Sequence, residues 1–172
     1  HDELWPLIVG DDISQSEMIW QKMFKMTHAQ RNYGLWMEAI ACIDTAIWDL
    51  RGKSLGISVC NLAGGYTDRL KVIATGGYYA KGKSSKDIAE EMQYLQSVGM
   101  FGIKFKVGGL SPEEDIERVA AAREGAGPEF AIGCDANRGW GIDEAIRFAR
   151  LAEPLNVHWF EEPCHWHDDA SM

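Results

Sequence analysis

The sequence has no long hydrophobic run and no excess of positive charge, and each absence excludes a class of protein. No apolar stretch approaches the roughly 18 residues that a membrane-spanning helix needs. The formal net charge is -9 at pH 7, so we expect neither nucleic acid nor an anionic membrane as a partner, because this surface would repel both. An acidic protein that binds an anionic substrate must supply local positive charge from lysines or from a metal ion.

Closely spaced cysteines are also missing. Cys42, Cys60, Cys134 and Cys164 lie far apart and form no CxxC pair. Cys42 and Cys134 have apolar neighbours in the sequence, so we expect them to be buried free thiols in a protein of the reducing cytoplasm. The chain begins at His1 rather than at a methionine, and it closes soon after an acidic motif, so we expect it to be part of a longer protein.

The spacing of apolar residues differs between the two parts of the chain. Residues 1–65 have the three- and four-residue spacing of helices: Ser14 or Ser16 can cap the first helix, and a second runs from about residue 36 to 53. From residue 66 onward, short apolar strands alternate with helices. Strands are expected to begin near residues 72, 102, 130 and 157, with helices at 87–98, 112–126 and 142–152.

A strand period of about 28 residues is typical of βα units, which close into an eight-stranded barrel or an open doubly wound sheet. Neither GxGxxG nor GxxxxGK[ST] follows any strand, so the phosphate-binding signals of the open sheet are missing. Polar residues instead follow successive strands, which is where barrel enzymes keep their chemistry. We predict an α/β fold: about half of a TIM-like (β/α) barrel over residues 66–172, preceded by helices of another domain over residues 1–65.

Two lysines lie two positions apart on the second expected strand, so the side chains of Lys104 and Lys106 point to the same face. Most lysine pairs lie outward on a solvated edge strand. Here, however, the alternating Ile103, Phe105 and Val107 must pack against the helices. We therefore predict that both lysines point into the barrel, where burial and mutual repulsion lower a lysine pKa towards the range useful for a base.

Carboxylates follow the next two strands. Asp135 ends the third strand, with Asn137 two positions further on, and Glu161 and Glu162 end the fourth. The next helix has its own candidate cap in Asp143, which leaves Asp135 free to bind a hard cation. Asn137 can orient that carboxylate or touch a substrate oxygen. Adjacent glutamates point opposite ways, so only one of them can be a ligand of a given site.

A zinc site is the alternative near the end of the chain, where His158, Cys164, His165 and His167 lie close together in the sequence. Their spacing matches no familiar zinc pattern. We therefore prefer a surface loop here and place the cation at Asp135.

Together these motifs resemble the enolase superfamily, in its mandelate racemase and muconate-lactonizing branches. Lys104-Phe105-Lys106 is similar to the family's KxK on the second barrel strand. Asp135-Ala136-Asn137 is similar to its DxN on the third strand, and Glu161-Glu162-Pro163 to its EEP on the fourth. The stretch over residues 52–65 is similar to the family's GKxxGxPxxxLLGG, with Ser58 in place of the usual proline.

The resemblance implies a Mg²⁺-dependent enzyme that removes the proton alpha to a carboxylate through an enediolate intermediate, most simply an acid-sugar dehydratase. Asp135 and Glu161 would be two of three Mg²⁺ ligands. Lys106 would be the acid/base on one face of the α-carbon, and Lys104 would support the substrate carboxylate or lower the pKa of Lys106. Asn137 would contact substrate. The resemblance also implies that the helices before the barrel belong to an α+β capping domain. It further implies that the protein is cytoplasmic and forms a homo-oligomer.

The reaction stays open, because the family carries its third metal ligand on the fifth strand and its opposite-face base on the sixth or seventh. A cycloisomerase or epimerase of the muconate-lactonizing type shares the motifs seen here. A non-enzymatic alternative is an inactive half-barrel that only self-associates through its two open sheet edges. On this resemblance the 172 residues alone should be inactive.

Overall fold

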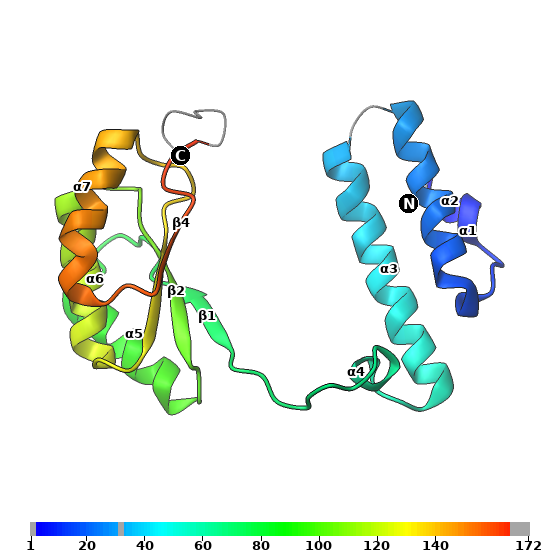
Figure 1. Cartoon of the computed structure of the whole chain (residues 1–172), viewed down its shortest axis with the longest axis horizontal. Helices are drawn as coiled ribbons and strands as arrows, with labels where there is room; N and C mark the ends of the chain where they lie inside the picture. Colours follow the sequence, from blue (N-terminus) through cyan, green and yellow to red (C-terminus); the bar gives the residue numbers. More distant parts are fainter. Residues whose placement is uncertain (1–2, 31–32, 166–172) are drawn as a thin grey trace. The chain divides into compact units, whose positions relative to one another are not determined.

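The computed structural model describes residues 3–30 and 33–165, which form two compact units. The first unit ends at Leu70 and the second begins at Lys71. Figure 1 shows the helices of the first unit and the sheet of the second. In the described ranges, no helix is both long enough and apolar enough to cross a membrane.

The first unit is helical, as its spacing predicts. Its elements are α1 (Trp5–Ile8), the 3-10 turn η1 (Ile13–Gln15), α2 (Ser16–Gln30), α3 (Tyr33–Leu55) and α4 (Val59–Leu62). Helices α2 and α3 pack side by side around the buried Ile19, Met23 and Ile40 (Figure 1). The Asp12 side chain accepts the Ser14 N–H and caps the turn η1, whereas the predicted cap residues Ser14 and Ser16 lie inside η1 and at the first position of α2.

The predicted burial of Cys42 is wrong, because this residue is exposed on α3. Adjacent helix positions lie about 100° apart, so a residue with apolar neighbours in the sequence can still lie off the apolar stripe. The stripe that reaches the core contains Ile40, Ile43 and Ile47. Cys134, in contrast, is buried as predicted.

The second unit is a parallel sheet whose described strands follow the order β1-β2-β3-β4. Its strands are β1 (Ile73–Gly76), β2 (Gly102–Lys106), β3 (Ala131–Asp135) and β4 (Trp159–Glu161). Its helices are α5 (Ser85–Ser97), α6 (Pro112–Ala126) and α7 (Ile142–Ala152), followed by the 3-10 turn η2 (Glu153–Leu155). Figure 1 shows the three α-helices on one face of the sheet. The strand order does not reverse as in a doubly wound sheet, so the predicted α/β fold with part of a barrel is confirmed.

Two of these helices begin at a serine that forms a capping box. Ser84 caps α5 together with Asp87, and Ser111 caps α6 together with Glu114. Helix α7 instead begins after Gly141, whose N–H is accepted by the Glu144 carboxylate. The predicted cap at Asp143 is therefore wrong, since this residue already lies in the first turn of the helix.

The core of the second unit lies between the sheet and its helices. Ile103, Phe105 and Val107 point towards the helices and are buried together with Ile132 and Cys134. Because side chains alternate along a strand, the residues between them project from the other face of the sheet. The polar residues of β2 and β3 lie on that second face.

Candidate functional site

The parallel register brings three charged residues level at the carboxyl ends of β2, β3 and β4. Lys106 pairs with Asp135 across β2 and β3, and Asp135 pairs with Glu161 across β3 and β4. Residues of one register row point to the same face of a sheet. These three side chains therefore meet on the face opposite the helices.

Four short contacts join these charged groups and Asn137. Lys106 Nζ lies 2.7 Å from Asp135 Oδ2 and 2.7 Å from Asn137 Oδ1. Lys104 Nζ lies 3.1 Å from the same Asp135 oxygen and 3.3 Å from Glu161 Oε1. The structure thus brings together all five residues that the sequence predicts for the site, and each lysine has at least one carboxylate partner.

Asp135 is the most deeply buried member of the group, with a side-chain exposure of 1%. Burial raises the pKa of a carboxyl group. The pKa of Asp135 nevertheless lies below its ordinary value, because the ammonium of Lys106, the N–H of Asn137 and the ammonium of Lys104 all donate to it. This carboxylate is therefore held in its charged form.

The expected lowering of the lysine pKa is wrong for Lys104. Its pKa is raised, first because its ammonium donates to Asp135 and then because it also donates to Glu161. Burial lowers the pKa of Lys104, but the two carboxylates that face it outweigh this effect.

Backbone strain is concentrated next to these residues. Asn137, Arg138 and Glu162 have positive φ angles of 44°, 64° and 44° without being glycine. The Asn137 N–H donates to Asp135 Oδ1 at 2.9 Å, and the Arg138 N–H donates to the Glu162 carbonyl at 2.7 Å. Such conformations cost free energy and are enriched at functional sites. Here they lock the loops after β3 and β4 together.

The two adjacent glutamates have different partners, and Glu162 lies just beyond the end of β4. Glu161 pairs with Lys104, while Glu162 pairs with Arg138 at 3.5 Å. Only Glu161 therefore faces Asp135.

The donor set fits a hard cation. Two carboxylates from neighbouring strands, Asp135 and Glu161, converge on a single positive charge, which in this structure is the Lys104 ammonium. Carboxylate oxygens are the ligands that Mg²⁺ prefers. In the part of the chain that the structure describes, no group of three or more His, Cys, Asp or Glu side chains could hold a metal ion. Asp135 and Glu161 would thus be two ligands of a larger set.

Of the alternative zinc site, His158, Cys164 and His165 lie within the described residues and belong to no such group. Cys164 is buried, and His165 is exposed. His167 lies outside the described residues.

One neighbour of the site was not predicted from the sequence. Trp159 Nε1 donates to Glu161 Oε2 at 3.2 Å, and its ring lies over Gly133, where an added Cβ would be 2.1 Å from the ring. The two residues are paired in the register of β3 and β4. The glycine inside an apolar strand was the available signal, because it marks a close approach of another group.

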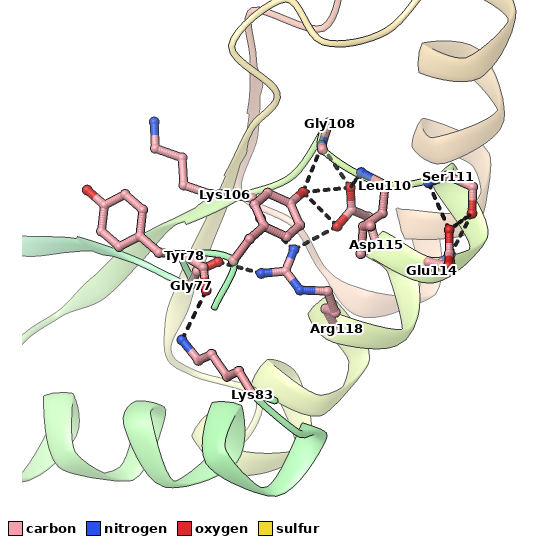
Figure 2. Close-up of polar contacts among 12 residues, drawn as sticks. Gly77, Tyr78, Lys83, Lys106, Gly108, Leu110, Ser111, Glu114, Asp115 and Arg118 are labelled. Carbon is pink, nitrogen blue, oxygen red and sulfur yellow. Dashed lines mark hydrogen bonds and ion pairs between the residues drawn. The ribbon is translucent and has the colours of Figure 1, made fainter. Parts of the chain in front are cut away.

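A second group that sequence reasoning missed lies behind the carboxyl end of β2. It consists of Tyr79, Asp115 and Arg118, and Figure 2 shows the contacts of Asp115 with Arg118 and with the turn at Gly108 and Leu110. An Asp in the first turn of a helix is normally explained by the helix dipole, so no sequence pattern indicated its burial.

Comparison with known proteins identifies both parts of the chain. Residues 1–64 match the family model described as "Mandelate racemase / muconate lactonizing enzyme, N-terminal domain". Residues 87–172 match the model described as "Enolase C-terminal domain-like".

Curated relatives match over most of this chain. It is 38% identical over 160 residues to arabinonate dehydratase of Saccharolobus solfataricus, which covers 93% of this chain and 43% of that protein. It is 35% identical over 158 residues to D-galactarolactone cycloisomerase of Agrobacterium fabrum, which covers 91% of this chain and 42% of that protein. The chain thus spans less than half the length of these two relatives.

A solved structure with the same fold is a mandelate racemase/muconate lactonizing enzyme from a marine actinobacterium, in complex with magnesium. It has a TM-score of 0.85 and 45% sequence identity, over 98% of this chain and 47% of that one.

Proposed function

Because the chain belongs to the mandelate racemase and muconate lactonizing enzyme family of the enolase superfamily, we propose that the protein removes the proton alpha to a carboxylate with the help of Mg²⁺. The observation that carries this proposal is the convergence of Lys104 and Lys106 with Asp135 and Glu161 at the carboxyl ends of three adjacent strands. A barrel enzyme keeps its reacting groups at this end of its strands.

In this proposal Asp135 and Glu161 hold the metal, and each of the other residues has a separate role. A bound Mg²⁺ would stabilise the negative charge that develops on the substrate carboxylate when the α-proton leaves. Lys106 accepts and returns that proton. The side-chain oxygen of Asn137 lies 2.7 Å from the Lys106 nitrogen, so Asn137 orients this lysine and also contacts substrate. Lys104 supplies positive charge to the substrate carboxylate, which a protein with net charge -9 would otherwise repel.

We propose dehydration of an acid sugar as the overall reaction, supported by the 38% identity to a dehydratase. Cycloisomerisation or epimerisation is the second candidate, supported by the 35% identity to a cycloisomerase. An inactive half-barrel that only self-associates is the non-enzymatic alternative. Assembly into a homo-oligomer, a cytoplasmic location and the inactivity of residues 1–172 on their own stay predictions.

The test compares Lys106→Ala with Asp135→Ala in the full-length protein. Exchange of the α-proton is followed by NMR in deuterated water on a panel of sugar acids, and Mg²⁺ binding by calorimetry. Lys106→Ala should lose exchange on one face of the α-carbon by about 100-fold or more while keeping its Mg²⁺ affinity, since a lysine is not a ligand. Asp135→Ala should lose metal and exchange together.

Lys83→Ala is the matched control, because Lys83 also pairs with a carboxylate, Glu91, but has no contact with Asp135. It should leave both measurements unchanged. Exchange on both faces in Lys106→Ala would remove Lys106 from its role as base and would refute the proposed mechanism.

A further inference from the structure

One fully buried carboxylate, Asp115 on α6, is not part of the site described above. It accepts the N–H groups of Gly108 at 2.8 Å and Leu110 at 3.4 Å, and the Tyr79 hydroxyl donates to both its oxygens at 2.8 Å. Its counter-ion is Arg118, with Nη1 2.7 Å from Oδ1. A buried charge is tolerated when it is paired and fully hydrogen-bonded, and Asp115 meets both conditions.

Arg118 connects this carboxylate to the proposed base. Its Nη1 donates to the main-chain carbonyl of Lys106 at 2.9 Å, and its Nη2 donates to the carbonyl of Gly77, which follows β1. Figure 2 shows the guanidinium between Asp115 and Gly77. The same group lies 4.0 Å from the centre of the Tyr79 ring, so stacking and hydrogen bonds together fix its plane.

The turn that follows Lys106 is held by the same residues. The Gly109 N–H donates to the Tyr79 hydroxyl at 2.9 Å, while the Gly108 N–H donates to Asp115. Burial raises the pKa of Tyr79 above its ordinary value, so its hydroxyl keeps the proton that it donates to Asp115. The main chain is thus hydrogen-bonded to this network on both sides of Val107.

We propose that Arg118, held in place by Asp115, is a positioning residue for Lys106. It fixes the main chain from which the long Lys106 side chain reaches Asp135 and Asn137. This inference rests on the proposed function, in which Lys106 transfers the α-proton. Displacing a reacting group by about 1 Å can cost about 100-fold in rate, so a small shift of this main chain should be visible in turnover.

The chain contains a matched control on the same helix. Arg123 also donates to main-chain carbonyls, among them those of Phe130, Leu155 and Asn156, which precede β3 and β4 at the amino ends of the strands. Its contacts with those three carbonyls are 2.7 to 3.0 Å long. If Arg118 contributed only stability, substitutions at Arg118 and Arg123 should have the same kind of effect.

The test compares Arg118→Lys with Arg123→Lys in the full-length protein, on a sugar acid that the unsubstituted protein turns over. Lysine keeps the charge but loses the planar fork that reaches two carbonyls. In Arg118→Lys, kcat and α-proton exchange should fall 10- to 100-fold, while KM and Mg²⁺ affinity change less than threefold. Deuterium uptake at the Gly108 and Leu110 amides should accelerate. In Arg123→Lys, the melting temperature should fall with kcat near that of the unsubstituted protein.

Tyr79→Phe is the milder second variant if Arg118→Lys does not fold, and it should lower kcat several-fold with little change in KM. An unchanged kcat in a folded Arg118→Lys or Tyr79→Phe variant would overturn the positioning role and leave the proposed function intact. Equal losses of kcat in the Arg118 and Arg123 variants would also overturn it. Undiminished α-proton exchange in Lys106→Ala would instead refute the proposed function, and this inference with it.

Discussion

Lys104 Nζ lies 3.1 Å from Asp135 Oδ2, so an ammonium on β2 neutralises a carboxylate on β3 whose side chain is only 1% exposed. The same ammonium reaches Glu161 on β4 at 3.3 Å. The Lys104 ammonium on β2 therefore forms ion pairs with the carboxyl ends of both β3 and β4. A divalent cation that uses the same carboxylate oxygens would have to displace this ammonium or share them with it.

Replacing Lys104 with methionine should therefore tighten Mg²⁺ binding while abolishing turnover. Removing a unit charge about 4 Å from a divalent cation relieves about 2 kcal/mol of repulsion even in water, which corresponds to more than a tenfold gain in affinity. Calorimetric titration with Mg²⁺ measures this gain in affinity. Lys83→Met is the control, because the Lys83 ammonium pairs with Glu91 instead. The Mg²⁺ affinity of this variant should equal that of the unsubstituted protein. Weaker binding in Lys104→Met would show that the lysine helps to assemble the metal site.

Local signals explain which parts of the fold could be predicted. Helix α6 occupies residues 112–126 as expected, because Ser111 caps it, proline stands at its first position and Gly127 follows its end. Strand parity likewise predicted that Lys104 and Lys106 would share one face of β2. Both arguments need only residues that are close together in the sequence.

Other features depend on contacts between distant segments. The raised pKa of Lys104 comes from carboxylates 31 and 57 positions away, whose distances no sequence pattern fixes. Likewise, Tyr79 and Asp115 are 36 positions apart in the sequence. The short helix α4 at residues 59–62 was missed because one turn carries too few residues to show a period.

Gly108 should tolerate alanine far less well than Gly127. Both have positive φ angles, 90° and 72°, so alanine is strained at either position. A Cβ at Gly108 would also lie 2.5 Å from the main-chain oxygen of Ala136, whereas a Cβ at Gly127 meets nothing within 4 Å. We expect losses of about 3 kcal/mol and about 1 kcal/mol in the free energy of unfolding, respectively, measured by urea denaturation. Equal losses would mean that backbone strain alone decides the outcome.

Ser111→Ala should lower the free energy of unfolding by about 1 kcal/mol through loss of the α6 cap. The Ser111 hydroxyl accepts the Glu114 N–H, and the Glu114 carboxylate accepts the Ser111 N–H, so the substitution breaks a reciprocal pair. Ser97→Ala is the control, because that exposed hydroxyl only donates to the Tyr94 carbonyl at the end of α5. The control should lose a few tenths of a kcal/mol at most. A control loss as large as that of Ser111→Ala would contradict the capping role.

Cys134 should make the stability of the protein fall at alkaline pH. Burial between the sheet and its helices raises the pKa of this thiol to about 12. In the unfolded chain a cysteine loses its proton near pH 8.5, to within about a unit. Between these two values the unfolded state binds fewer protons than the folded state, so the free energy of unfolding falls as the pH rises.

The measurement is urea denaturation of the unsubstituted protein and of Cys134→Ala from pH 7 to pH 10.5. Alanine leaves a cavity and lowers stability at every pH, but it has no proton to lose. Below about pH 8 the thiol is protonated in both states, and the difference in stability between the two proteins should be constant. Above about pH 9 the advantage of Cys134 should shrink, approaching about 1.4 kcal/mol for each pH unit. A difference in stability between the two proteins that stays constant from pH 7 to pH 10.5 would contradict this prediction. It would show that the folded protein also releases the Cys134 proton in this range. The thiol would then be less well shielded from water than its position between β3 and the helices implies.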